Sequence, residues 1–236
     1  MSELLREFGP AIWIGDGPIV SFLGFAYPTR IVLIKLSNGR LFVWSPIKLS
    51  AALKRDVDAL GPVGFLVSPN RLHHLFLAEW KSAYPQARLC ASPGLRKKCK
   101  DLAFDADLGD SPEPEWAIDI DQVPVRGSFI TEVEFFHRAS RTAIFADLIQ
   151  NFPPDWFKGW RGVIARLDGI CAPHPGAPRE WRAGFLNRRA ARAALQRILT
   201  WPIERVLIAH GEPVTENGTI FVRQAFAWLI GEQALQ

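Results

Sequence analysis

Short apolar runs separated by turn residues dominate the first part of the chain. The runs at residues 11–14, 29–36 and 41–44 are apolar and rich in β-branched side chains, and Asn38-Gly39 separates the last two. An Asn-Gly pair between two apolar runs is a strong signal for a tight β-hairpin. The pattern therefore predicts an antiparallel β-meander over residues 11–44.

From residue 50 the hydrophobic period alternates between helical and strand spacing. Apolar residues between 49 and 60 share one helical face, and Gly61-Pro62 would end that helix. The next predicted elements are a strand at 65–67, a helix at 72–83, a strand at 87–91 and a basic helix at 93–102. Strand and helix in alternation predict a largely parallel sheet with right-handed crossovers.

The second half combines further strands with one long segment of irregular composition. We predict an exposed loop at 105–116, strands at 118–125, 131–137, 142–148 and 205–209, a helix that Asn187 caps, and a last helix at 219–232. Residues 151–185 are rich in Trp, Pro, Gly and Arg with little period. Segments of that length without a period are usually lids or linkers, so we predict a lid or insertion there within a single domain spanning 1–236.

Composition identifies a packed globular protein. Of the 236 residues, 48% are apolar and 22% are charged, which is too apolar for a disordered chain. Three widely spaced cysteines without a Cys-x-x-Cys pair favour neither a disulfide framework nor a structural zinc site. The first residues are charged, and no apolar run approaches the ~20 residues that cross a bilayer. We therefore expect a cytoplasmic protein without a membrane segment.

The net charge of +4 is small, but its distribution is uneven. Seven arginines fall between residues 179 and 205 with only two glutamates among them. The segment is a candidate contact for an anionic small-molecule substrate, and the simpler interpretation of Arg188, Arg189 and Arg192 is a solvated helix face. The small excess of positive charge argues against a nucleic-acid partner.

Candidate chemistry gathers at the ends of predicted strands. His73 and His74 follow the strand at 65–67, His137 and Asp147 stand near the ends of two later strands, and His210 closes the last one. Strand ends in α/β sheets give side chains a rigid base beside an opening to solvent. Neutral imidazoles and carboxylates are ligands that suit zinc, iron or manganese. If these residues converge, they predict a metal site.

The order of elements and two short motifs resemble the metallo-β-lactamase superfamily. The motifs are Asn-x-x-His-His-Leu at residues 70–75 and Ala-His-Gly at residues 209–211. They are similar to those of a bacterial group within the superfamily whose metal motif is degenerate. The resemblance spans most of the chain and implies an αββα four-layer sandwich, an α/β fold in which two mixed sheets face each other with helices outside. It also implies a metal-dependent hydrolase-like protein.

The first metal motif of that superfamily, Thr-His-x-His-x-Asp-His, falls on residues 68–74. Pro69 and Arg71 replace the first two histidines, His73 stands at the position of the aspartate, and His74 keeps the last histidine. The fixed charge of Arg71 would oppose a cation in the first metal subsite, and we assign Arg71 to substrate binding. The resemblance therefore implies one metal ion at most.

The remaining ligands implied by the resemblance lie in the second half. Asp147 matches the acidic bridging ligand and His210 the final histidine, while His137 lies near the mid-chain histidine but lacks its Gly-His-Thr context. The implied ligand set is His73, His74, Asp147 and His210, with His137 as an additional site residue. The implied cofactor is one divalent ion, with zinc preferred and iron or manganese as alternatives.

Simpler interpretations stay open for several of these residues. Neighbouring residues on a helix point ~100° apart, so His73 and His74 need not face one ion. His137 shares an apolar face and suits a core histidine, and His174 lies in a Pro-rich loop. The preferred function is hydrolysis of an ester, lactone or phosphoester. The alternatives are a non-catalytic binding or regulatory member of the same fold and, third, a nucleic-acid-processing protein.

Overall fold

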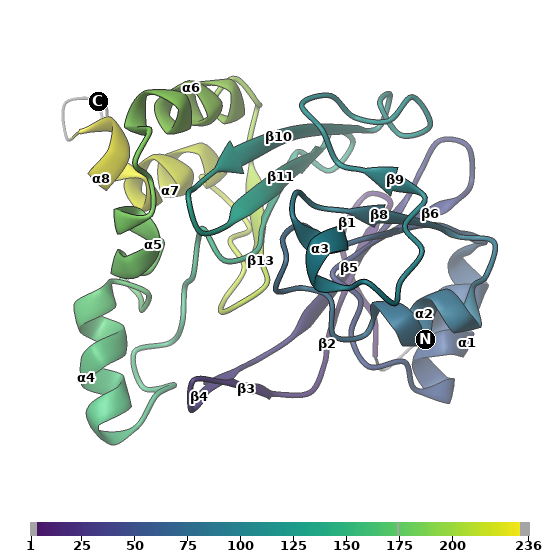
Figure 1. Cartoon of the computed structure of the whole chain (residues 1–236), viewed down its shortest axis with the longest axis horizontal. Helices are drawn as coiled ribbons and strands as arrows, with labels where there is room; N and C mark the ends of the chain where they lie inside the picture. Colours follow the sequence, from purple (N-terminus) through teal and green to yellow (C-terminus); the bar gives the residue numbers. More distant parts are fainter. Residues whose placement is uncertain (1–3, 174, 232–236) are drawn as a thin grey trace.

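Two mixed β-sheets organise the chain, which the computed structural model describes over residues 4–173 and 175–231 (Figure 1). The first sheet has seven strands in the order β1 (Arg6–Gly9), β2 (Ile12–Asp16), β5 (Arg30–Lys35), β6 (Leu41–Trp44), β7 (Val63–Val67), β8 (Arg88–Ala91) and β9 (Ala106–Asp107). The strands from β1 to β6 are antiparallel, as the predicted meander requires, and those from β6 to β9 are parallel.

The second sheet has four strands in chain order. They are β10 (Ile120–Arg126), β11 (Thr131–His137), β12 (Thr142–Phe145) and β13 (Arg205–Ile208). The first three are antiparallel, and β12 and β13 run parallel, so their carboxyl ends meet at one edge. Phe42 and Phe65 of the first sheet lie in one buried cluster with Phe135 of the second. The two sheets therefore pack face to face.

Helices cover the outer face of each sheet. The first sheet carries α1 (Ala51–Leu60), α2 (Leu77–Ala83) and α3 (Leu95–Lys98), whose buried residues join the cluster of Leu33, Val43 and Leu66. The second sheet carries α6 (Arg188–Ile198), α7 (Gly218–Ala225) and α8 (Ala227–Ile230). The four layers are those of the αββα sandwich, so the predicted fold class is confirmed.

Local sequence explains where the predicted helices begin and end. Ser50 caps α1, because its side chain accepts a hydrogen bond from the Leu53 backbone N–H at 3.1 Å. Asn187 caps α6 in the same way through Ala190 at 3.0 Å. The buried face of α6 carries Ala191, Leu195 and Ile198, as the spacing predicts.

The chain forms a hairpin and two helices that the hydrophobic pattern did not predict. The hairpin consists of β3 (Val20–Phe22) and β4 (Phe25–Tyr27), and the predicted lid at 151–185 contains α4 (Gly159–Asp168) and α5 (Arg179–Ala183). Phe25 and Tyr27 of the hairpin pack on Phe152 and Phe157, so the hairpin and the segment support each other. Figure 1 shows β3 and β4 beside the connection that leads into α4.

Three predicted helices differ in extent. The basic helix at 93–102 is limited to the four residues of α3. The helix at 72–83 begins only at Leu77, because residues 70–76 form turns. The last helix breaks at Phe226 into α7 and α8, and its predicted final residue, 232, lies outside the described residues, as does His174. No helix in residues 4–173 and 175–231 is long and apolar enough to cross a membrane.

A candidate metal centre between the strand ends

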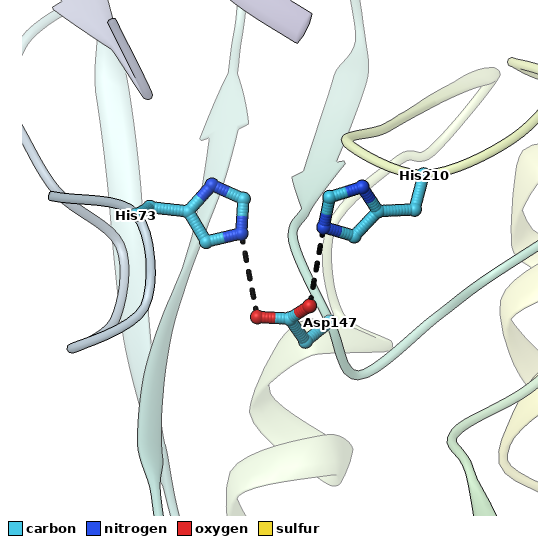
Figure 2. Close-up of side chains that lie close together, drawn as sticks. All are labelled: His73, Asp147 and His210. Atoms are coloured by element: carbon cyan, nitrogen blue, oxygen red, sulfur yellow. Dashed lines mark ion pairs between the residues drawn. The ribbon is translucent and has the colours of Figure 1, made fainter. Parts of the chain in front are cut away.

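Three side chains from distant parts of the chain converge at the edge where the two sheets meet. His73 lies on the turn after β7, Asp147 follows β12, and His210 follows β13. Figure 2 shows both imidazoles directed at the Asp147 carboxylate, one toward each oxygen. His73 Nε2 lies 3.3 Å from Asp147 Oδ2, and His210 Nε2 lies 3.2 Å from Oδ1. One potential ligand atom from each residue lies within 4.8 Å of the other two.

A backbone carbonyl fixes the orientation of His210. Its Nδ1 lies 2.8 Å from the carbonyl oxygen of Pro28, and a carbonyl oxygen only accepts hydrogen bonds, so Nδ1 carries the proton. In the neutral ring Nε2 is then a bare lone pair that faces the Asp147 carboxylate. At 3.2 Å this arrangement is favourable when a cation lies between the two groups, either a proton on Nε2, which gives an ion pair with Asp147, or a metal ion that takes its place. The donor set therefore fits a divalent ion, which imidazole and carboxylate ligands hold at about 2.0–2.2 Å.

His73 is held in a comparable way from the first sheet. Its Nδ1 lies 2.7 Å from Ser45 Oγ, and its ring lies against Trp44 with ring centroids 5.9 Å apart. The turn that carries it is closed by Ser68, whose hydroxyl lies 2.7 Å from the carbonyl oxygens of both Asn70 and His73. A partner on the second nitrogen that fixes the ring is a common accompaniment of a metal-ligating histidine.

Asp147 is buried, and two neighbours hold it in the ionised form. Burial alone would raise the pKa of its carboxyl, but the charge and hydrogen bonds of His73 and His210 outweigh burial and place that pKa well below its ordinary value. Asn70 adds a hydrogen bond from its Nδ2 to Asp147 Oδ2 at 2.7 Å. A buried carboxylate with these partners is an anionic ligand of fixed position.

Glu132 on β11 fixes the backbone on either side of Asp147. Its two oxygens accept hydrogen bonds from the backbone N–H groups of Ala146, Asp147 and Leu148 at 2.8–3.2 Å. They also accept one from Asn70 Nδ2 at 2.7 Å, so Asn70 joins both carboxylates. Burial and the negative charge of Asp147 raise the pKa of Glu132, while hydrogen bonds from Glu134 and the backbone oppose that rise.

Glu134 stands beside Glu132 on the same face of β11. No donor from the described residues faces its carboxyl oxygens, and burial followed by the charge of Glu132 raises the pKa of Glu134 well above its ordinary value. The two carboxyls can share a hydrogen bond when Glu134 keeps its proton and donates to Glu132. A neutral glutamic acid therefore supports the glutamate that holds the Asp147 loop.

The loop that carries His210 is attached to the first sheet by Arg30. Its Nη1 donates hydrogen bonds to the carbonyl oxygens of Ile208 and Gly211, each at 2.7 Å, and its Nε forms an ion pair with Asp16 at 2.8 Å. Gly211 has φ +117°, and a Cβ there would collide with the Asn151 carbonyl. The glycine of the Ala-His-Gly motif is thus required by close backbone contact.

A cavity of about 260 Å³ opens beside the three converging residues. Its wall includes Tyr27, whose ring meets the His210 ring edge-on with centroids 5.0 Å apart. Burial, followed by the charge of Asp147, raises the pKa of the Tyr27 hydroxyl. The three converging residues therefore border a space in which a small molecule can lie.

The structure separates the other predicted site residues from this group. His74 lines the cavity but is not part of the converging group. Its Nδ1 lies 3.0 Å from the Leu72 carbonyl oxygen, and burial lowers the pKa of its imidazole. Arg71 is exposed, does not line the cavity, and uses its carbonyl to accept a hydrogen bond from Lys98. The converging set therefore contains three of the four predicted ligands.

His137 lies at the opposite end of β11 from Glu132. It pairs with Thr142, where β12 begins, whereas Asp147 comes after β12 has ended. The His137 side chain is buried, and its Nδ1 lies 2.8 Å from Ser140 Oγ. At ~3.3 Å per strand residue, five residues place it roughly 16 Å from the Glu132 end. This position corresponds to the core interpretation, not to a ligand of the same ion.

Several supporting residues were not predicted from sequence. Asn70 belongs to the Asn-x-x-His-His-Leu motif, but its function as a bridge between two carboxylates needs partners 62 and 77 residues away. Glu132 and Glu134 did offer a signal. In an αββα sandwich both faces of a strand in the position of β11 are covered by other layers. Glutamates that alternate with apolar residues in such a strand must therefore be buried.

Comparisons with solved structures support the fold alone. The flavodiiron core of Flv1 from Synechocystis sp. PCC6803 matches with a TM-score of 0.65 and 15% identity over 98% of this chain, which spans 61% of that core. A metallo-β-lactamase from Pontibacter korlensis matches with a TM-score of 0.59 and 8% identity, covering 97% of this chain and 99% of that one.

A metallo-β-lactamase from Hirschia baltica matches with a TM-score of 0.61 and 12% identity, covering 95% and 96% of the two chains. No protein-family model and no curated protein sequence matches the chain. The fold is accordingly that of the metallo-β-lactamases and flavodiiron cores.

Proposed function

We propose that the chain is a hydrolase-like protein that uses one divalent metal ion held by His73, Asp147 and His210. The observation that supports this most directly is the position of His210 Nε2, which faces a buried carboxylate at 3.2 Å while Pro28 accepts the hydrogen bond from the other ring nitrogen, so that a metal ion can take the place of a proton between them. Zinc is the preferred ion, since two imidazoles and one carboxylate are a ligand set of zinc enzymes, and iron and manganese remain alternatives.

A divalent ion at this position would act as a Lewis acid and would lower the pKa of a water molecule toward neutrality. The chain supplies the positioning. Pro28 and Ser45 orient the two imidazoles, while Asn70 and Glu132 hold the Asp147 carboxylate. Tyr27 covers one side of His210 and restricts solvent there. A substrate in the adjoining cavity would then present its carbonyl or phosphoryl centre to the site.

Nothing in the geometry favours a second ion. Pro69 and Arg71 stand where the superfamily motif has two histidines, and the side chain of Arg71 is exposed outside the cavity. Among the described residues, the three converging side chains form the one group that offers at least three such ligand atoms. The proposal is therefore a mononuclear site.

The decisive experiment measures metal content by plasma mass spectrometry in four untagged proteins purified in parallel. They are the wild type, His73→Ala, His210→Ala and the matched control His74→Ala. We expect about one equivalent of metal in the wild type and in His74→Ala, and a loss of metal from the other two. Circular dichroism verifies that each variant is folded.

Two results would contradict the proposal. The first is wild-type protein that contains no metal and does not bind added zinc, iron or manganese. That result would contradict the hydrolase function and favour a non-catalytic binding protein. Loss of metal from His74→Ala with retention in His73→Ala would show that the ligand set is wrong. If the expected pattern is found, esters, lactones and phosphodiesters are the substrates to screen.

A further inference from the structure

The cavity beside the candidate metal centre has a wall of large apolar side chains. Phe22 of the β3–β4 hairpin, Leu75 and Phe76 of the turn before α2, and Trp181 of α5 all line it. Phe22 and Leu75 are 49% and 60% exposed in the free protein. Hydrophobic side chains of this size at the rim of a cavity lose contact with water when an apolar ligand group covers them.

The charges in the cavity do not suit a polyanion. Among the described residues that line it, Lys98 is the one lysine or arginine, and its Nζ donates a hydrogen bond to the Arg71 carbonyl at 3.0 Å. Glu180 adds a negative charge to the same wall. Phosphate sites usually contain arginines that bind in a bidentate manner, and the described residues that line this cavity include no arginine.

Gln150 has a buried polar atom that no described residue satisfies. This residue is only 2% exposed and lines the cavity, and within residues 4–173 and 175–231 no group donates a hydrogen bond to its Oε1. The side-chain amide is held near Tyr27, where its hydrogen bond lowers the pKa of the Tyr27 hydroxyl against the larger effect of burial. The backbone is fixed as well, because Gln150 exchanges two hydrogen bonds with Gly176 at 3.0 and 3.1 Å.

An acceptor buried in this way is costly unless a donor reaches it. Gln150 stands three residues after Asp147, on the loop that carries the candidate ligand. A ligand N–H or O–H group close to the reacting centre would satisfy Oε1. Gln150 is thus placed to select among apolar ligands by their hydrogen-bond donors.

A second apolar cavity adjoins the first across α5. It has a volume of about 170 Å³, and it shares Glu180 and Trp181 with the first. Phe129, Ile130 and Phe185 form its other apolar wall. Glu180 and Trp181 therefore border both cavities, and an apolar chain longer than the first cavity would have to pass Trp181 to enter the second.

From these observations we infer that the site takes an uncharged substrate with an extended alkyl or acyl chain, and that Gln150 is a specificity-determining residue that accepts a hydrogen bond from a donor beside the reacting group. This inference rests on the proposed function for the position of the reacting group. The binding of the apolar chain does not require the metal ion.

The test uses calorimetric titration with uncharged ligands of known chemistry and one anionic comparison ligand. The ligands are N-alkyl acetamides with chains of four, six and eight carbons, the matching alkyl acetates, which lack the N–H donor, and hexyl phosphate. The proteins are the wild type, His210→Ala, Gln150→Leu, Leu75→Ala and the matched control Ile118→Ala, whose exposed side chain lies outside both cavities.

We expect Kd to decrease about fourfold with each added methylene in the wild type, in His210→Ala and in Ile118→Ala. The amide should bind at least about fivefold more tightly than the acetate of equal length, because a buried hydrogen bond contributes about 1 kcal/mol. Gln150→Leu should lose this preference and keep the dependence on chain length. Leu75→Ala should weaken all alkyl ligands about equally.

Either of two findings would overturn the inference: an affinity that does not change with chain length, or hexyl phosphate binding more tightly than the hexyl amide. An equal amide preference in Gln150→Leu and wild type would remove the assignment of Gln150. These results are distinguishable from a failure of the metal proposal. Chain-length dependence in a protein that holds no metal contradicts only the metal site, whereas a loaded metal site without that dependence contradicts only the substrate class.

Discussion

A substitution of His137 tests whether this residue is a core histidine or a metal ligand. The two interpretations predict different effects on how the free energy of unfolding depends on pH. Burial lowers the pKa of the His137 imidazole from 6.5 to about 4, and the charge of Asp119 opposes this only in part. Ser140 donates its hydroxyl hydrogen to Thr142 Oγ1 at 2.8 Å, so Ser140 Oγ is free to accept from His137 Nδ1–H. The folded protein therefore holds the neutral ring.

The magnitude follows from the two pKa values. Above pH 6.5 the ring is neutral in both states, and its contribution to stability is complete. As the pH falls below 6.5 the unfolded chain takes up a proton that the folded chain refuses until about pH 4. The free energy of unfolding should decrease by up to about 1.4 kcal/mol per pH unit in this window and by about 3 kcal/mol across it.

The assay is urea denaturation of wild type and His137→Asn at pH values between 4.5 and 7.5. Asparagine can present an N–H group near the position of Nδ1 but does not titrate, so the variant should be less stable at pH 7.5 yet lose less stability on acidification. The difference between the two slopes is the readout, because carboxyl groups titrate alike in both proteins. Equal slopes would refute the core interpretation, and loss of bound metal from a folded His137→Asn would assign the residue to the site.

Three further substitutions test the residues that support the site. Asn70→Asp places a third carboxylate beside Glu132 and Asp147, where the Asn70 amide now donates a hydrogen bond of 2.7 Å to each. Urea denaturation at neutral pH should show a free energy of unfolding lower by at least about 3 kcal/mol. An unchanged midpoint would contradict the bridging function. Arg30→Met leaves the carbonyl oxygens of Ile208 and Gly211 without their donor. It should lower the free energy of unfolding by about 2–4 kcal/mol and weaken metal affinity in the same protein. A stable variant with normal affinity would show that Arg30 does not hold the loop. Glu134 keeps its proton in the folded protein while the unfolded chain releases it above about pH 4.5, so the contribution of Glu134 to stability falls as the pH rises. Glu134→Gln should therefore gain stability relative to wild type over that range. Parallel stability curves would mean that Glu134 is ionised in the folded state.

The sequence predicted the elements whose signals are local. Patterns within about fifteen residues were sufficient for these elements. They are the Asn38-Gly39 hairpin, the α1 helix between its Ser50 cap and Gly61, and the parallel strands β7 and β8. Asp147 and His210 follow the same logic, because both stand directly after buried strands that turned out to be parallel neighbours. Their convergence follows from this parallel pairing, which the sequence pattern did not specify.

The choice between His73 and His74 was not predictable from the pattern. Helical spacing suggested a helix from residue 72, which would direct the two rings about 100° apart without showing which one faces the site. In the structure the helix starts at Leu77, and residues before it form turns closed by Ser68. The contacts of Ser68 with this turn and of Ser45 with the His73 ring accompany the position in which His73, and not His74, faces Asp147.

Contacts between distant residues account for most of what the sequence did not reveal. Pro28 supports His210 across 182 residues, and it does so with its backbone carbonyl, which any residue could supply. The β3–β4 hairpin has strands of three residues with mixed exposure, too short for a clear period. Such features depend on which segments meet after folding, and the residue types alone do not specify that.

The three candidate ligands divide between the two sheets. His73 follows a strand of the first sheet, whereas Asp147 and His210 follow strands of the second. A cation bound to all three would therefore link the two sheets. Its binding free energy would then add to the free energy of unfolding. At a free concentration a thousandfold above Kd this thermodynamic linkage amounts to about 4 kcal/mol. The melting temperature of the whole chain would then report the occupancy of a site formed by three side chains.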